Sequence, residues 1–304
     1  MLGKYFAMFI IQQHKVPDGI SKIRLLDYAL MVFTTIPSKS SMKKVIRKGA
    51  LLVDGQKVPS GSWVLVGQEL TLLDLEHNPP KPYELKLDIV YEDEHLAIIN
   101  KPAGIEVSGN KFKTIQNALV SNISISTEPD ALKWARPVHR LDRPTSGLLL
   151  VAKTASTLML LGQKLEKQEI QKKYRAIVAG KIDDKGEISN SIAEQEALSS
   201  YNCISWCRSL KTHWLSLVEL SPHTGRTHQL RIHMADYGFP IVGDKQYGDG
   251  PVLRGNGLFL AAVELSFKHP ITEEKLTVKI EQPSKFNSLI EKEKLRWKLF
   301  NNNN

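Results

Sequence analysis

The stretch that most constrains the fold runs from residue 137 to 153 and reads Pro-Val-His-Arg-Leu-Asp-Arg-Pro-Thr-Ser-Gly-Leu-Leu-Leu-Val-Ala-Lys. Its apolar part, Leu148 to Ala152, predicts a buried strand, because it is long enough for the centre of a sheet and too short for a helix. Pro144 and Gly147 predict a turn before that strand. A rigid strand behind such a turn can fix a reactive carboxylate, although a solvated ion-pair loop would have the same composition. The turn carries one carboxylate with basic groups on both sides: Asp142, between His139, Arg140 and Arg143.

The same stretch resembles the signature of the RluA-type pseudouridine synthases through the run His-Arg-Leu-Asp-x-x-Thr-Ser-Gly-Leu-Leu-Leu-Val-Ala-Lys. Enzymes of that family isomerise uridine to pseudouridine in structured RNA. The resemblance implies that Asp142 is the essential catalytic carboxylate. It leaves open whether the carboxylate attacks the base, attacks the sugar or acts as a base toward the sugar. It implies no metal and no nucleotide cofactor, and the sequence has neither a P-loop nor a Gly-x-Gly-x-x-Gly match.

Two later segments resemble further motifs of the family. Residues 172–181 read Lys-Lys-Tyr-Arg-Ala-Ile-Val-Ala-Gly-Lys and predict an alternating strand. The resemblance places the ring of Tyr174 against the target base, where stacking needs no particular sequence; a half-buried strand tyrosine is the alternative. Residues 222–235 predict a loop that enters a helix, and the resemblance makes Arg231 the partner of Asp142. A fixed guanidinium favours the ionised form of a buried carboxylate.

The strand pair that opens this part of the chain resembles the family's first motif. Residues 87–104 predict two apolar strands around an acidic turn, and they end in Lys-Pro-Ala-Gly. In the family this motif helps to frame the active-site cleft. From the motif loops together we expect contacts to RNA from six residues: Lys101, His139, Arg140, Arg226, His228 and Gln229.

Residues 22–76 form a separate predicted unit. A first helix is expected near residues 23–30, and a second is capped by Ser38 or Ser40 and ended by Gly49. The segment Val-Asp-Gly-Gln-Lys-Val that follows predicts two short strands around an Asp-Gly turn. The unit resembles the S4 RNA-binding domain through its Arg-Leu-x-Asp start, its Ser/Lys-rich helix and its Val-Asp-Gly turn.

The second helix of this unit carries an acid-free set of cations. Their spacing of three and four residues places them largely on one side of the helix. Such a set can neutralise RNA phosphates, so we expect it to bind RNA; a solvated basic helix is the alternative. We call it the basic stripe, and it consists of Lys43, Lys44, Arg47 and Lys48.

Composition agrees with an RNA partner without proving one. The net charge is +9, from 41 basic and 32 acidic residues, which favours nucleic acid over a membrane. Cys203 and Cys207 form no disulfide framework in a chain of this length. The apolar start at residues 5–11 is too short to span a bilayer and has no cleavage site. We therefore expect a cytoplasmic monomer.

Three histidines at a spacing of five, His223, His228 and His233, invite a metal-site interpretation. That spacing puts successive side chains on different helix faces, and no cysteine or carboxylate cluster joins them. We therefore predict no metal. A deaminase is also disfavoured, because the chain has neither His-x-Glu nor Pro-Cys-x-x-Cys.

Taken together, the sequence predicts an α+β protein in two parts. An S4-like α+β domain at residues 22–76 precedes a catalytic domain at 83–300 with the pseudouridine synthase fold on a mixed, largely antiparallel sheet, and a proline-rich linker at 77–82 joins them. The predicted function is uridine isomerisation in large-subunit (23S) ribosomal RNA, with transfer RNA as the second choice. A catalytically silent RNA-binding protein that assists ribosome assembly is the alternative.

Overall fold

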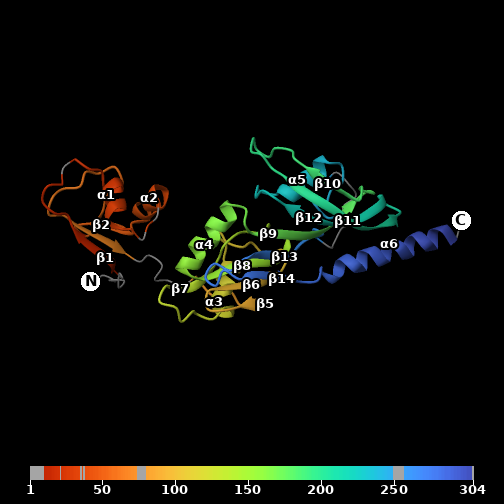
Figure 1. Ribbon diagram of the computed structural model, residues 1–304, viewed down its shortest axis with the longest axis horizontal. Helices are drawn as coiled ribbons and strands as arrows, with labels where there is room; N and C mark the ends of the chain where they lie inside the picture. The colour runs from red at the N-terminus through yellow and green to blue at the C-terminus, as the bar shows by residue number, and fades with distance from the viewer. Residues whose placement is uncertain are drawn as a thin grey trace, which may run out of the picture. The chain divides into compact units, whose positions relative to one another are not determined.

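The computed structural model describes residues 10–20, 22–34, 36, 38–73, 80–248 and 257–302. The chain divides into two compact units, one up to Pro79 and one from Pro80 onward (Figure 1). The linker predicted at 77–82 lies outside the described residues as far as Pro79.

The first unit is a four-stranded sheet, of order β1-β4-β2-β3, with two helices. Strand β1 pairs antiparallel with β4, so the unit includes a strand that the predicted domain, starting at residue 22, left out. The elements are β1 (Ile10–Lys15), α1 (Leu25–Val32), α2 (Lys39–Lys48), β2 (Leu51–Val53), β3 (Gln56–Lys57) and β4 (Glu69–Leu73).

Helix α2 forms as its sequence predicts. The side chain of Ser38 accepts a hydrogen bond from the Ser41 N–H at 3.2 Å, which caps the helix. Gly49 ends it in the left-handed region, at a φ of 73°. Met42 and Ile46 are buried in the core of the unit, and the four residues of the basic stripe are all exposed. The helix is therefore amphipathic, with its cations turned to solvent.

The second unit is built on a ten-stranded sheet, of order β10-β11-β12-β9-β13-β8-β6-β5, with β7 added beside β8 and β14 beside β13 (Figure 1). Among the described pairings between strands of this sheet only β8 with β13 is parallel, so the prediction of a mixed, largely antiparallel sheet is confirmed. The strands are β5 (Asp88–Glu92), β6 (Leu96–Lys101), β7 (Ala131–Pro137), β8 (Ser146–Thr154), β9 (Gln171–Ala179), β10 (Lys185–Ile188), β11 (Ser199–Ser209), β12 (His213–Pro222), β13 (Leu260–Lys268) and β14 (Lys275–Lys279). The helices are α3 (Ile115–Asn122), α4 (Ala155–Glu166), α5 (Gln229–Asp236) and α6 (Ser284–Asn302).

Strand β8 is the predicted buried strand, and residues 148–152 are wholly inaccessible to solvent. Alternate side chains of a strand point to opposite faces. Accordingly Leu149 and Val151 join one core cluster with residues of α3, and Leu148 and Leu150 join another with Leu161 of α4. The strand is thus covered on both faces.

The two halves of the sheet meet at Ala262. This residue pairs with Gly147 of β8 on one side and with Tyr174 of β9 on the other. Gly147 has a φ of 108°, and a Cβ there would collide with the Ala262 backbone, so only glycine fits. Beyond this bridge β8 continues beside β7, and β13 continues beside β14. The bridge therefore brings the loop before β8 close to Tyr174.

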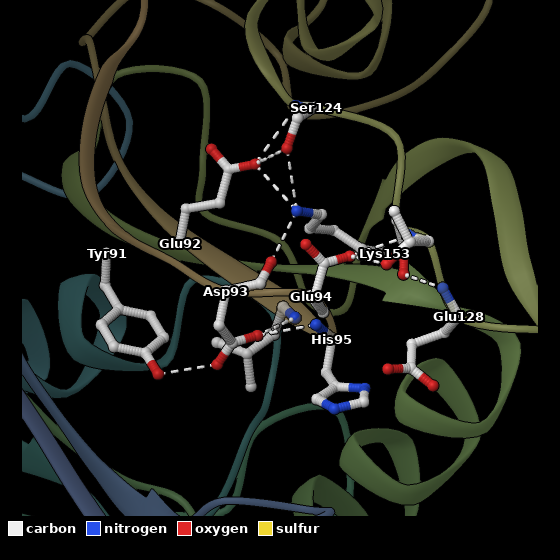
Figure 2. Close-up of polar contacts among 11 residues, drawn as sticks. Tyr91, Glu92, Asp93, Glu94, His95, Ser124, Glu128 and Lys153 are labelled. Carbon is white, nitrogen blue, oxygen red and sulfur yellow. Dashed lines mark hydrogen bonds and ion pairs between the residues drawn. The ribbon is translucent and has the colours of Figure 1, made fainter.

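A buried ammonium group fixes the opposite end of β8. Lys153 is 2% exposed, and its Nζ donates to Glu92 Oε1 at 2.9 Å and to Ser124 Oγ at 3.0 Å (Figure 2). It also donates to the backbone oxygen of Asp93, whose carboxylate accepts from the Tyr91 hydroxyl at 2.6 Å. Burial acts to raise the pKa of Glu92, but the bonds from Ser124 and Lys153 outweigh it and lower that pKa. These bonds therefore tie the turn between β5 and β6 to the end of β8.

Candidate active site

Asp142 lies in the loop between β7 and β8, with its side chain 17% exposed. The backbone oxygen of Asp142 accepts a hydrogen bond from the Thr145 N–H at 3.0 Å, which closes the turn predicted here. Its carboxylate has two basic neighbours: Arg231 Nη1 lies 3.5 Å from Oδ2, and His228 Nε2 lies 3.5 Å from Oδ1. The loop before β8 thus presents one carboxylate to two side chains that come from the start of α5.

Arg231 makes its tightest contacts with a residue that the sequence did not single out. Its Nε donates to Asp244 Oδ2 at 2.6 Å and its Nη2 donates to Asp244 Oδ1 at 2.8 Å. The two side chains are 6% and 1% exposed. Arg231 was predicted to pair with Asp142, and that contact exists, but Asp244 holds the guanidinium with the short two-point geometry that arginine and carboxylate prefer. The third nitrogen of the guanidinium is left facing Asp142.

The charges of this pair reinforce each other. Burial would lower the pKa of Arg231, but the hydrogen bond and charge of Asp244, and then the charge of Asp142, raise it overall. Burial would raise the pKa of Asp244, but the bonds from Arg231 and from the Gln246 N–H lower it overall. Both groups are therefore ionised at neutral pH, and the guanidinium stays charged beside Asp142.

His228 stands at the start of α5 in the left-handed region, at a φ of 57°. Its Nδ1 is 2.9 Å from the hydroxyl of Tyr247, which leaves Nε2 directed at Asp142. A non-glycine residue in this backbone region is uncommon and is often found at functional sites. His228 was predicted to contact RNA. It lines both of the two cavities that adjoin Asp142.

Two cavities adjoin Asp142. One, of about 600 Å³, is bounded by Glu106, Arg143 and Lys245 among others. The second, of about 620 Å³, is lined by Tyr174 and reaches past the carboxylate toward β9. Both have the size of small-molecule sites. Burial, and then the charge of Asp142, raises the pKa of the Tyr174 hydroxyl, so the ring is uncharged at neutral pH.

Besides His228, three basic residues that were predicted to contact RNA lie at these cavities. Arg140 is exposed and borders both of them. Arg226 borders the larger one, and its Nε donates to the Glu196 backbone oxygen at 3.0 Å. His139 also borders the larger cavity, but its Nε2 accepts from the Leu150 N–H at 3.2 Å. Burial and then the charge of Lys172 lower the pKa of His139 to about 4, so it supplies no positive charge at neutral pH.

Gln229, also predicted to contact RNA, borders the larger cavity, but its amide is occupied by partners within the protein. The side chain is 4% exposed, and its oxygen accepts from the Thr224 hydroxyl at 2.7 Å and from the Arg226 N–H at 3.0 Å. Its nitrogen donates to the Leu198 backbone oxygen and to Ser199 Oγ, both at 2.9 Å. The amide is fully used inside the protein, where it ties the α5 entry loop to β11.

Lys101, also predicted to contact RNA, is fully buried. Its Nζ donates to the backbone oxygens of Pro102 at 2.9 Å and Ile105 at 2.8 Å, and more weakly to that of Arg143 at 3.4 Å. Burial lowers the pKa of Lys101 to about 8, against the opposing charge of Asp142. Lys101 therefore joins the first motif to the loop of Asp142 and does not reach the surface.

The three histidines considered as metal ligands have other partners. His233 is buried between Ser199 Oγ, at 3.0 Å from Nδ1, and the Asn190 backbone oxygen, at 2.9 Å from Nε2. His223 Nε2 lies 2.9 Å from Ser200 Oγ. Within the described ranges no group of His, Cys, Asp or Glu is arranged to hold a metal ion, and no helix is long and apolar enough to cross a membrane.

Comparison with known proteins agrees with this geometry. Residues 95–236 match the family described as RNA pseudouridylate synthase. The ribosomal large subunit pseudouridine synthase C of Vibrio cholerae is 33% identical over 298 residues, which cover 88% of this chain and 92% of the relative. The tRNA pseudouridine synthase C of Pasteurella multocida is 36% identical over 224 residues, covering 64% and 90%.

Among solved structures, human RNA pseudouridylate synthase domain containing 1 superposes with a TM-score of 0.56 at 26% identity, covering 65% of this chain and 84% of that one. The chain therefore belongs to the RNA pseudouridylate synthase family, and the family predicted from its motifs is confirmed. It is accordingly an RNA pseudouridine synthase, an isomerase.

Proposed function

We propose that this enzyme isomerises uridines of large-subunit ribosomal RNA, with Asp142 as the carboxylate required for the bond exchange. Arg231 is its charge partner, and Tyr174 lies against the target base. One observation carries the assignment: Asp142 borders a cavity of about 620 Å³ together with Tyr174, beside a guanidinium that Asp244 holds in place. A negative charge flanked by fixed donors is stabilised without reorganisation during the reaction.

The reaction needs few chemical groups. The bond from uracil N1 to the sugar C1′ breaks, the base turns, and a bond from C5 to C1′ forms. The hydrogen on C5 then leaves as a proton, and N1 gains a proton. In this scheme Asp142 acts on the nucleoside. Tyr174 offers a flat ring that keeps the loosened base in the cavity, since aromatic stacking tolerates reorientation in the ring plane.

The choice of ribosomal RNA rests on the relatives and on the first unit. Similar enzymes are named for large-subunit ribosomal RNA and for tRNA. The S4-like unit adds an exposed set of cations, the basic stripe, for which no ion pair occurs in the described part of the chain. Such a surface suits a large folded RNA, so ribosomal RNA is the first candidate and tRNA the second. We infer that the enzyme acts in the cytoplasm as a monomer.

Release of tritium from C5 of uridine tests the activity, because the new bond at C5 displaces that hydrogen. Wild-type enzyme should release it from 23S ribosomal RNA. Asp142→Asn should release none while it still binds the RNA. Asp236→Asn, an exposed acid at the end of α5, is the matched control and should behave as wild type. If Asp142→Asn turned over within tenfold of wild type, the role of Asp142 would be wrong; if wild type released nothing, the silent RNA-binding alternative would stand.

The basic stripe has its own test. Changing its four residues to Ala should weaken binding to every structured RNA and flatten the slope of log affinity against log salt by about three to four. An equal loss of charge from exposed lysines of the second unit should flatten the slope less. An unchanged slope in the stripe variant would show that the stripe is only solvated surface. The control variant changes Lys268, Lys275, Lys292 and Lys298 to Ala.

A further inference from the structure

A third, smaller cavity opens beside the one that is lined by Tyr174. It measures about 290 Å³, against about 620 Å³ for the larger cavity. Gln171 and His223 line only the smaller one. Lys172 lines both, so it stands where the two cavities meet. If one unit of a polymer filled the larger cavity and the next unit filled the smaller one, the link between the two units would lie at Lys172.

The direction of the Lys172 side chain follows from its strand. Residues two apart in a strand point to the same face, so Lys172 shares the face of Tyr174 on β9. Lys173 and Arg175 occupy the other face, where both pair with Glu219, at 3.2 Å and 2.8 Å. Lys173 therefore lies beside a carboxylate, whereas its neighbour Lys172 faces the cavities.

Lys172 has no counterion of its own. In the described part of the chain its side chain has no hydrogen bond and no carboxylate partner. It is shielded from solvent enough that burial lowers its pKa. The titratable group that feels its charge most clearly is His139, which is itself neutral. Holding a partly buried cation without a partner costs free energy, and a ligand that brings negative charge would offset that cost.

We propose that Lys172 binds a backbone phosphate of the RNA next to the target uridine, with the target nucleoside in the larger cavity and its neighbour in the smaller one. The inference rests on the proposed function, which brings a single RNA strand to Asp142. An ammonium group suits a phosphate because it acts as a compact point charge that accepts many approach directions. Around the neighbouring nucleotide, Gln171 and His223 supply polar groups at the smaller cavity.

The test compares three variants in RNA binding and in single-turnover rate at saturating enzyme. Lys172→Met keeps the length of the side chain and removes the charge, and it should weaken binding roughly 10- to 100-fold. It should also flatten the salt slope by about 0.7. Lys172→Arg should restore most of the affinity. Lys173→Met is the matched control and should bind as wild type. Because Lys172→Met removes an unpaired cation, it should unfold at or above the wild-type temperature, which separates lost binding from lost folding.

Chemically altered RNA locates the contact. A methylphosphonate in place of the phosphate on one side of the target uridine removes the negative charge there. On one of the two such RNAs, wild type should lose as much affinity as Lys172→Met loses on ordinary RNA, and Lys172→Met should lose nothing more. If the two losses add on both RNAs, Lys172 contacts the uracil oxygens instead and the proposal is overturned. It is also overturned if Lys172→Met and Lys173→Met bind alike. These binding results stand whether or not wild type releases tritium, so they are independent of the test of activity.

Discussion

The anchoring of Arg231 by Asp244 leads to a quantitative prediction for Asp244→Asn. Asparagine keeps the shape of the side chain and an oxygen for the Gln246 and Tyr247 N–H groups that Asp244 accepts from. It removes the negative charge that pairs with the buried guanidinium of Arg231. The amide nitrogen of asparagine would also face the Nε–H of Arg231, so that two hydrogen-bond donors would meet. Breaking a buried ion pair from one side costs about 3–5 kcal/mol. That is a large part of the roughly 5–15 kcal/mol that stabilises a typical domain.

Two measurements should respond to this change. Thermal unfolding of the second unit should shift down by about 6–20 °C, from about 2–4 °C per kcal/mol for a domain of this size. The saturating single-turnover rate should fall roughly 100-fold, because a displacement of about 1 Å at a catalytic group costs that much. The exposed-acid control Asp236→Asn should change stability by less than about 0.5 kcal/mol. Stability within 1 kcal/mol of wild type and a rate within threefold would refute the idea that Asp244 positions Arg231.

A double variant sharpens the test. Asp142 and Asp244 share one guanidinium, at 3.5 Å and 2.6 Å. Asp142→Asn alone still leaves Arg231 its closer partner and should cost little stability. Combined with Asp244→Asn it leaves a buried cation with no carboxylate, so the double variant should lose more stability than the sum of the single variants. If the stability losses of the two single variants simply added in the double variant, Asp142 and Asp244 would not both be paired with the charge of Arg231.

Three further predictions concern residues around the site. The pKa of His139 is depressed to about 4 in the folded protein, so the fold favours its neutral form. The free energy of unfolding should therefore fall by roughly 2–3 kcal/mol as the pH falls from 6.5 to 4. His139→Gln should lack that part of the pH dependence of unfolding. Gly147→Ala should prevent a native sheet because its Cβ meets the Ala262 backbone, whereas Gly162→Ala, with open space inside α4, should stabilise by about 0.5–1 kcal/mol in urea unfolding. Lys101→Met should lower the tritium-release rate more than RNA affinity, since Lys101 holds the site loops and is buried.

Motif and periodicity predicted the elements that carry local signals. The buried strand at 148–152, the cap of α2 by Ser38 and the strand of Tyr174 all appear where the sequence placed them. Each depends on neighbours within a few residues, so a single sequence can reveal it. Strand β1 was missed because its apolar residues precede the helices and pair with β4, more than 50 residues later.

The partners within the site were harder to foresee. Asp244 follows Gly243, whose φ of 81° and contact with the Gly257 backbone admit only glycine, so the turn that returns this acid to Arg231 depends on a distant segment. The Gly-Asp pair was the only local signal, and alone it predicts just a turn. The burial of Gln229 was not foreseen, because a polar residue in a basic loop suggests a surface, whereas its burial is decided by β11.

The bridge at Ala262 has a consequence for folding during translation. Strand β8 ends at Thr154, and β13, its partner at Gly147, begins at Leu260, about 100 residues later. At typical synthesis speeds of about 5–20 residues per second, the start of β8, which pairs with β13, waits roughly 5–20 s for that neighbour, while the end of the same edge already has β7 beside it. During that interval the nascent chain exposes a short unpaired edge at the start of a largely apolar strand, a hazard for aggregation. Arg231 of α5 and Tyr174 of β9 emerge within the same interval, yet β9 is joined to β8 and the loop of Asp142 only when β13 arrives. An enzyme that modifies RNA is thus inert until almost its whole length has been translated.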